Sequence, residues 1–186
     1  MPRYILTGTP GAGKTAILRL LELDGYAVVE EAATDVIAVD QALGHDQPPD
    51  RPAFIDQIVR LQRHRQTVAP LGNGATIVFD RSPICTLALS RYSDVAPSRL
   101  LLAEIDRIRA QRVYEPAAFF VRNQGFVRRT AARRISFADA LRFERIHEHT
   151  YTELGFSLVE IPAAPLADRV ALVKQTIQRL QPAGCL

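Results

Sequence analysis

A glycine-rich octapeptide near the N-terminus, Gly-Thr-Pro-Gly-Ala-Gly-Lys-Thr at residues 8–15, fits the pattern G-x-x-x-x-G-K-[S/T] at every position. Glycines let successive backbone N–H groups turn inward toward an anion, because a Cβ atom would obstruct such turns. An apolar run at residues 3–7 precedes the octapeptide, and residues 14–23 have the apolar spacing of a helix. The positive N-terminal end of that helix adds to the same anion site. The sequence therefore predicts a phosphate-binding strand–loop–helix unit.

The residues of this loop have separate expected roles in binding ATP. The phosphates are expected to be held by the whole loop, namely Gly8, Thr9, Pro10, Gly11, Ala12, Gly13, Lys14 and Thr15. The Lys14 ammonium should reach the outer phosphates, and the Thr15 hydroxyl should ligate Mg²⁺. Only Lys14 and Lys174 are lysines among the 23 basic residues. A chain that otherwise uses arginine has thus kept a compact, mobile ammonium at the loop.

The rest of the chain alternates short apolar runs with stretches of helical spacing. Strands are expected at residues 3–7, 26–30, 75–79, 117–121 and 156–161, and helices at 14–23, 33–43, 53–68, 83–92, 97–111, 137–154 and 166–180. Strands that alternate with helices pair in parallel through right-handed crossovers, which place helices on both faces of the sheet. The prediction is a three-layer α/β fold with a five-stranded parallel sheet. A length of 186 residues without a linker suits one domain, residues 1–186.

Composition narrows the class of protein. The 23 basic and 20 acidic residues form no long basic run, which argues against nucleic acid as the main partner. No apolar run approaches the roughly 20 residues that span a bilayer, and the N-terminus lacks a signal-peptide layout, so a cytoplasmic protein is expected. Cys85 and Cys185 are interpreted as bystanders. The four histidines, His45, His64, His147 and His149, show no metal-ligand spacing and are interpreted as surface residues.

The third expected strand ends in the dipeptide Asp80-Arg81. Asp80 could hold Mg²⁺ or accept the proton of an acceptor hydroxyl, and a helix N-cap or turn residue is the plainer alternative. Arg81 stands where a motor ATPase usually places a second carboxylate to activate water. The chain also lacks an Asn-Lys-x-Asp sequence for reading guanine. These features argue against a motor ATPase and against a GTPase.

The chain as a whole resembles the AAA-type predicted ATPase/kinase family, which includes ribosylnicotinamide-kinase-like domains and is related to nucleoside and nucleotide kinases. The residues that carry the resemblance are the loop at 8–15, Phe79-Asp80-Arg81-Ser82, the Arg-rich segment 128–134, and Tyr151-Thr152-Glu153-Leu154-Gly155-Phe156 followed by Ile161-Pro162. The resemblance implies that Asp80 and Arg81 serve chemistry and acceptor binding. It also implies a lid at about residues 124–136, whose arginines, chiefly Arg129 and Arg133, close over the transferring phosphate. The turn around Ala163 is implied to contact the adenine.

The acidic pair Glu30-Glu31 ends the second expected strand, at the edge where ligands gather in open α/β sheets. These carboxylates could bind the hydroxyls of an acceptor or act as base in place of Asp80, and a surface acidic pair remains the alternative. The family often continues with Arg or Tyr, whereas Ala32 follows here, so the acceptor's identity stays open. Three arginines of the helix expected at 53–68, Arg60, Arg63 and Arg65, could line the acceptor side, although a solvated helix face is the preferred interpretation.

The predicted function is ATP- and Mg²⁺-dependent transfer of a phosphoryl group to a small hydroxyl-bearing molecule, such as a nucleoside. Catalysis would then come from positioning and electrostatics rather than covalent chemistry. One alternative is a nucleotide-dependent switch or slow ATPase that acts on a protein partner. Another is an ATPase associated with nucleic acid, whose binding would depend strongly on salt. The sequence leaves the oligomeric state open.

Overall fold

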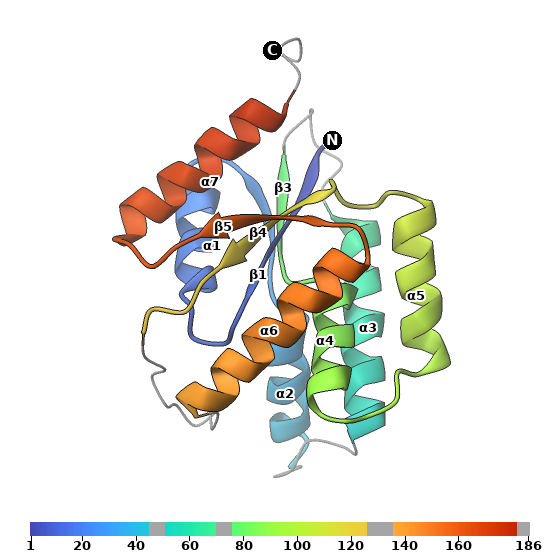
Figure 1. The fold of residues 1–186 in the computed structure, drawn as a ribbon. Helices are drawn as coiled ribbons and strands as arrows, with labels where there is room; N and C mark the ends of the chain where they lie inside the picture. Colours follow the sequence, from blue (N-terminus) through green and yellow to red (C-terminus); the bar gives the residue numbers. More distant parts are fainter. Residues whose placement is uncertain (45–50, 70–75, 126–135, 182–186) are drawn as a thin grey trace.

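The structure of the chain is a computed structural model that describes residues 1–44, 51–69, 76–125 and 136–181 (Figure 1). The described strands are β1 (Arg3–Gly8), β2 (Ala27–Val29), β3 (Ile77–Asp80), β4 (Ala117–Val121) and β5 (Ser157–Ile161). The described helices are α1 (Lys14–Leu23), α2 (Ala32–Ala42), α3 (Arg51–Val68), α4 (Pro83–Tyr92), α5 (Arg99–Ala110), α6 (Phe137–Glu153) and α7 (Leu166–Leu180).

The five described strands form one parallel sheet in the order β2-β3-β1-β4-β5. The central strand is β1, which pairs with β3 on one side and β4 on the other. Each connection between parallel strands carries at least one helix, as parallel pairing requires. The predicted α/β fold with a five-stranded parallel sheet is confirmed, and the glycine-rich loop leaves the carboxyl end of the central strand.

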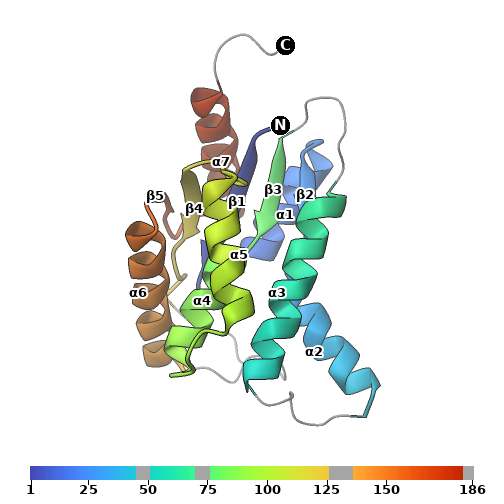
Figure 2. The same ribbon diagram turned by 90° about the vertical axis from the view of Figure 1, so that its right-hand side faces the viewer.

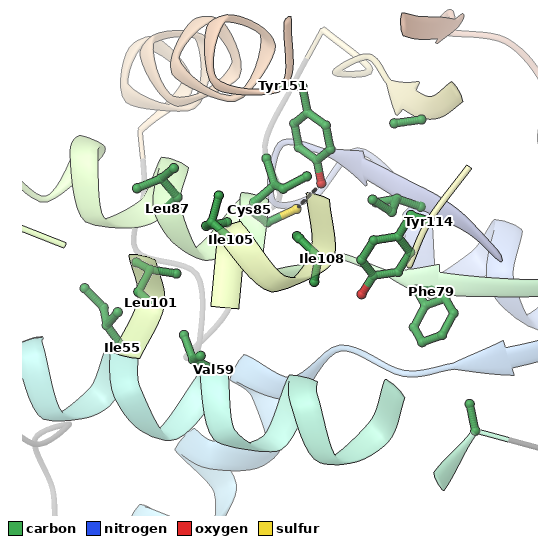
Figure 3. Close-up of a cluster of buried hydrophobic side chains, with 14 of the residues drawn as sticks. Ile55, Val59, Phe79, Cys85, Leu87, Leu101, Ile105, Ile108, Tyr114 and Tyr151 are labelled. Carbon is green, nitrogen blue, oxygen red and sulfur yellow. Dashed lines mark hydrogen bonds between the residues drawn. The ribbon is translucent and has the colours of Figure 1, made fainter. Parts of the chain in front are cut away.

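Two layers of helices cover the sheet because successive strand residues point to opposite faces (Figure 1). Ile5 belongs to a buried cluster with residues of α3, α4 and α5, whereas Tyr4 and Leu6 belong to a cluster with residues of α1 and α7. Figure 2 shows α3, α4 and α5 side by side over the first face, and these helices contact one another. Figure 3 shows the first cluster, in which Cys85 is buried beside the Tyr151 hydroxyl. None of the described helices is long and apolar enough to cross a membrane.

Most element boundaries differ from the prediction by one or two residues, and two of these differences have a clear local reason. β2 begins at Ala27 because Tyr26 closes the end of α1: its N–H donates to the Leu21 carbonyl, and Gly25 has a positive φ of 89°. α5 begins at Arg99, two residues later than expected, because the Ser98 hydroxyl accepts a hydrogen bond from the Leu101 N–H and caps the helix.

The close approach of β1 to β4 at Gly8 allows a test of this fold. Its φ is 126°, and a Cβ atom there would lie 2.2 Å from the Val121 carbonyl oxygen of β4. We therefore expect Gly8→Ala to lower the free energy of unfolding by at least about 3 kcal/mol, the sum of backbone strain and overpacking. The control is Gly25→Ala, where φ is also positive but no atom lies within 4 Å; it should cost about 1 kcal/mol. Urea unfolding measures both, and equal losses would contradict the close approach.

Candidate active site

The phosphate loop is shaped by three glycines with positive φ, namely Gly8, Gly11 and Gly13. The Ala12 N–H donates to the Thr9 carbonyl at 3.3 Å, which closes a turn inside the loop. Gly13 is the N-cap of α1 and has no side chain to accept from the first turn of the helix. The N–H groups at this helix end are therefore available to an anionic ligand, together with the positive end of the helix dipole.

Lys14 lies folded back on the loop that precedes it. Its Nζ donates to the Thr9 carbonyl at 2.9 Å and to the Gly8 carbonyl at 3.3 Å, and the residue is only 6% exposed. Burial, followed by repulsion from Arg81, lowers the pKa of Lys14 to about 8. Within the described part of the chain, Lys14 forms no ion pair with a carboxylate. A phosphate group in the loop would give this ammonium an anionic partner.

Asp80 ends β3 beside the central strand, where it is paired in register with Leu6. The residue is 5% exposed, and its Oδ1 is buried without a hydrogen-bond partner among the described residues. Burial raises the pKa of Asp80 because desolvation outweighs the attraction of Lys14 and Arg81. An unpartnered carboxylate oxygen is costly, and carboxylates and hydroxyls are ligands that Mg²⁺ accepts. Asp80 and the exposed hydroxyl residue Thr15 therefore fit the donor set of a magnesium site.

Arg81 is held in a conformation that residues other than glycine seldom adopt, with φ at 72°. Its Nε lies 2.5 Å from Glu31 Oε1, and its Nη1 donates to His147 Nε2 at 3.5 Å. Burial alone would lower the pKa of Arg81, but Glu31 raises it above its ordinary value. Burial would likewise raise the pKa of Glu31, but Arg81, Lys14 and Thr34 hold it below its ordinary value. Both groups are charged at neutral pH.

Two adjoining cavities open beside Lys14 and Arg81, and Asp80 lines neither of them. The larger has a volume of about 540 Å³ and is bounded by the phosphate loop, including Lys14 and Thr15, and by the start of α2. The second has a volume of about 240 Å³ and extends between α2, α3, α4 and α6. Their common walls are Pro10, Glu31, Ala33, Ile37 and Arg81. The ion pair Arg81–Glu31 therefore stands at the boundary between the cavity at the loop and a second pocket.

Comparison with known protein families identifies the family to which this chain belongs. The profile of the family described as AAA domain matches residues 3–169. The chain belongs to this AAA domain family.

Solved structures of two kinases share the P-loop NTPase fold of this AAA domain. Deoxyadenosine kinase from M. mycoides aligns with a TM-score of 0.59 and 14% identity, over 96% of this chain and 100% of that chain. Thymidylate kinase from Ehrlichia chaffeensis aligns with a TM-score of 0.66 and 15% identity, over 95% of this chain and 98% of that chain. At these identities the likeness shows the fold alone. None of the curated protein sequences matches the chain.

The other residues predicted for the site of this AAA domain lie apart from the two cavities or outside the described residues. The Glu30 carboxylate, which is half exposed, pairs with Arg19 and lines neither cavity. Ala163 is exposed in the turn after β5 and also lines neither cavity. Arg129 and Arg133, with most of the expected lid, lie outside the described residues. Of the three arginines considered for the acceptor side, Arg65 pairs with Asp35, and Arg60 and Arg63 are exposed on α3.

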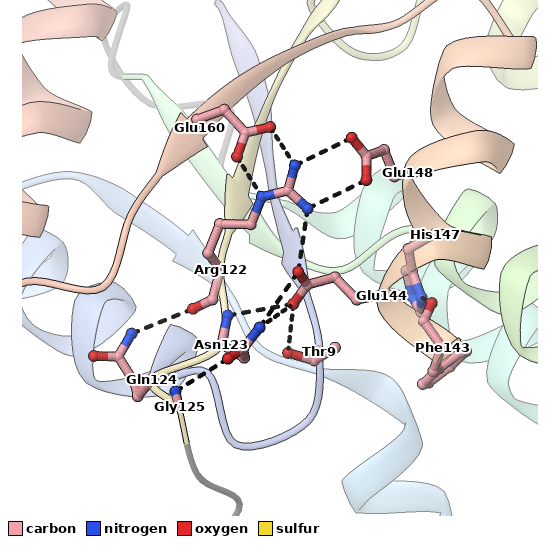
Figure 4. A network of polar contacts seen from close by, with 10 residues as sticks. All are labelled: Thr9, Arg122, Asn123, Gln124, Gly125, Phe143, Glu144, His147, Glu148 and Glu160. Carbon is pink, nitrogen blue, oxygen red and sulfur yellow. Dashed lines mark hydrogen bonds and ion pairs between the residues drawn. The ribbon is translucent and has the colours of Figure 1, made fainter. Parts of the chain in front are cut away.

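A polar network joins the AAA domain's loop to the end of β4, and the sequence did not reveal it (Figure 4). The Thr9 hydroxyl donates to Glu144 Oε2 at 3.4 Å, and the same carboxylate accepts from Arg122 and from the Asn123 N–H. Arg122 also pairs with Glu148 and Glu160. Glu144 thus connects α6, the phosphate loop and the start of the segment that leads to residues 126–135.

The interpretation of His147 as a surface residue is wrong, whereas His64 and His149 are exposed as expected and His45 lies outside the described ranges. His147 is fully buried because α6 packs against α4, and its Nδ1 lies 3.0 Å from the Phe143 carbonyl. The acceptor role of Nε2 toward Arg81 makes Nδ1 the donor, so the ring is neutral. The spacing of Ala140, Phe143, His147 and Tyr151 on one helix face could have predicted this burial.

The buried imidazole should make stability depend on pH. Burial, followed by repulsion from Arg81, lowers the pKa of His147 to about 3 in the folded state, against 6.5 for the free group. The unfolded chain therefore binds the extra proton first, and stability from the neutral ring is complete above pH 6.5 and is lost as pH falls toward 3. Between pH 7 and pH 5 we expect this group to remove about 2 kcal/mol.

The measurement is urea unfolding of wild type and His147→Gln at pH 7 and pH 5. The variant keeps a polar side chain but cannot titrate, so its stability should fall less between the two pH values. Subtracting the two curves removes the contributions of Asp80, Glu31 and the other carboxylates. Parallel curves would show that the neutral ring contributes nothing over this range.

Proposed function

We propose that this protein is an ATP- and Mg²⁺-dependent kinase that phosphorylates a hydroxyl group of a small molecule such as a nucleoside. The observation that carries the proposal is the shared wall of the two cavities, where Glu31 and Arg81 lie between the phosphate loop and a second pocket. Phosphoryl transfer needs a donor and an acceptor side by side in this way. The names of the two kinases that share the fold, deoxyadenosine kinase and thymidylate kinase, support the same class of reaction.

The donor nucleotide would occupy the larger cavity. Backbone N–H groups of residues 8–15 would surround the phosphates, and Lys14 would leave the Gly8 and Thr9 carbonyls to contact the outer phosphates. Thr15 and Asp80 would hold Mg²⁺, which would offset the charge of the phosphates. This assignment uses the unpartnered Asp80 Oδ1 as a metal ligand and leaves proton transfer to another carboxylate.

The acceptor would occupy the smaller pocket. Its walls are largely apolar, with Phe54, Ile58 and Leu89 among them, and Phe143 contributes an aromatic ring. Gln62 and Thr86 add hydrogen-bonding groups, and the Thr86 hydroxyl donates to Gln62 Oε1 at 2.9 Å. A flat, partly apolar ring system with a few polar atoms fits such a surface, and a nucleoside combines that ring with a hydroxyl.

The proposed reaction places the acceptor hydroxyl at Glu31. Its oxygen attacks the γ-phosphorus, the bond from that phosphorus to the β–γ bridging oxygen breaks, and ADP leaves with the electron pair of that bond. The hydroxyl proton passes to the Glu31 carboxylate, which is ionised at neutral pH. Arg81 would stabilise the charge on the transferring phosphoryl oxygens, since its planar fork matches them.

The first test is ADP release from purified protein with Mg-ATP, alone and with a panel of nucleosides, nucleotides and small sugars. A true acceptor should raise turnover well above the background. Lys14→Ala should lower the stimulated rate by about 10² or more, as removal of a single charge-stabilising group does. If ATP binds but no compound in the panel raises turnover, a switch or slow ATPase acting on a protein partner becomes the better description.

The adjacent carboxylates Glu30 and Glu31 offer a matched pair of variants. Glu31→Gln should lower kcat by about 10² or more, because it removes the proposed base and the ion pair of Arg81. Glu30→Gln should leave kcat within about twofold of wild type, because that carboxylate contacts Arg19 in an exposed ion pair. Steady-state kinetics with the identified acceptor measures both. Equal losses in the two variants would contradict the role given to Glu31.

A further inference from the structure

Arg169 is a buried arginine behind the phosphate loop. It lies in the first turn of α7, on the face of the sheet that α7 shares with α1 (Figure 1), and it is only 4% exposed. One of its terminal nitrogens, Nη2, donates to the Ala12 carbonyl. The other, Nη1, would lie 2.9 Å from a Cβ atom added at Gly13. The guanidinium therefore packs directly against the peptide that joins Ala12 to Gly13.

The charge of this guanidinium has no carboxylate partner in the described part of the chain. Arg169 forms no ion pair there, and its Nε is buried without a hydrogen-bond acceptor. Burial lowers the pKa of Arg169, but an arginine so placed stays protonated at neutral pH. A buried, uncompensated cation costs stability. The presence of the buried Arg169 charge is explained if an anion that binds close by offsets this loss of stability.

The phosphate loop offers the place for that anion. The C=O and N–H of a trans peptide point in opposite directions, so the Ala12 carbonyl that faces Arg169 turns the Gly13 N–H away from it. Gly13 also lines the larger cavity. A cation that hydrogen-bonds to a carbonyl polarises the whole peptide and makes its N–H a stronger donor.

We propose that Arg169 is a positioning residue for nucleotide phosphates: through the Ala12–Gly13 peptide it fixes and strengthens the Gly13 N–H, and its charge adds to the positive potential of the loop. The proposal rests on nucleotide binding at this loop, as proposed above, but not on the identity of the acceptor. A Cβ atom at residue 13 would press against the guanidinium, so the glycine there leaves room for Arg169 as well as allowing the positive φ of 86°.

A purely structural role predicts a different pattern of effects. If Arg169 only joined α7 to α1, its removal would lower thermal stability and weaken all ligands alike. If it acts on the phosphates, the loss of affinity should grow with the number of phosphates in the ligand. The adenine should not matter, so inorganic triphosphate should show the same loss as ATP. These two roles can therefore be separated by the choice of ligand.

The experiment is calorimetric titration of the full chain with ATP, ADP, AMP and inorganic triphosphate in the presence of Mg²⁺. Arg169→Met should weaken ATP and triphosphate by about tenfold or more, in line with loss of a charged hydrogen-bond partner, and AMP least. Arg169→Lys, which keeps the charge but not the planar fork, should restore part of that loss. The matched control is Arg179→Met, which removes an exposed arginine from the same helix and should change none of these affinities.

The outcomes separate this inference from the proposed function. If the wild-type protein does not bind ATP, the proposed function is overturned and the role of Arg169 with it. Loss of ATP binding in Lys14→Ala would show that ATP binds at the loop. Wild-type affinity with Arg169→Met unchanged, or an equal loss for AMP and ATP, would overturn the role of Arg169 alone. If Arg169→Met does not fold, Arg169→Gln decides, because it keeps a donor for the Ala12 carbonyl and removes the charge. A loss of about tenfold for ATP then supports the proposal, and unchanged binding overturns it.

Discussion

The approach of β1 to β4 at Gly8 is the constraint on which the site depends. Gly8 is paired in register with Val121, and the Val121 carbonyl leaves no room for a side chain. A strand that ends against such a neighbour must turn out of the sheet with a backbone that only glycine adopts readily. The turn delivers residues 9–13 to the start of α1 and brings Lys14 back onto the Gly8 and Thr9 carbonyls. Packing within the sheet thus sets the geometry of a polar loop.

The position of the loop at the end of β1 also determines which charged side chains surround it. Two buried cations, Lys14 and Arg169, and the partly buried Arg81 converge on it with two carboxylates, Asp80 and the partly buried Glu31. A further carboxylate at the loop, Glu144, is paired with Arg122. When the first five groups are ionised the cations exceed the carboxylates by one charge, and the N-terminal end of α1 adds to this excess. Low exposure keeps water from screening these charges. This positively charged environment would stabilise an anion such as a triphosphate bound to Mg²⁺.

The sequence predicts well what depends on neighbours along the chain. The order of elements, the phosphate loop and the position of Asp80 at a strand end follow from local pattern, and each needs only a few adjacent residues. His147, Glu144 and Arg169 were missed because their roles depend on which helix packs where. The apolar spacing around His147 on α6 does indicate burial, but a glutamate on that helix and an arginine in an arginine-rich chain carry no such signal. The packing of α6 and α7 brings Glu144 and Arg169 to the loop and His147 to Arg81.

The choice between lysine and arginine around the loop matches how each group is held. Arg81 contacts the Glu31 and His147 side chains, and Arg169 contacts the Ala12 carbonyl, each through nitrogens of a planar guanidinium. Lys14 contacts only backbone carbonyls of the loop itself. Its ammonium can leave them for a phosphate without breaking an ion pair among the described residues. In a chain that uses arginine almost everywhere, lysine thus stands where the proposed function requires the charge to move, and arginine where it requires the charge to stay.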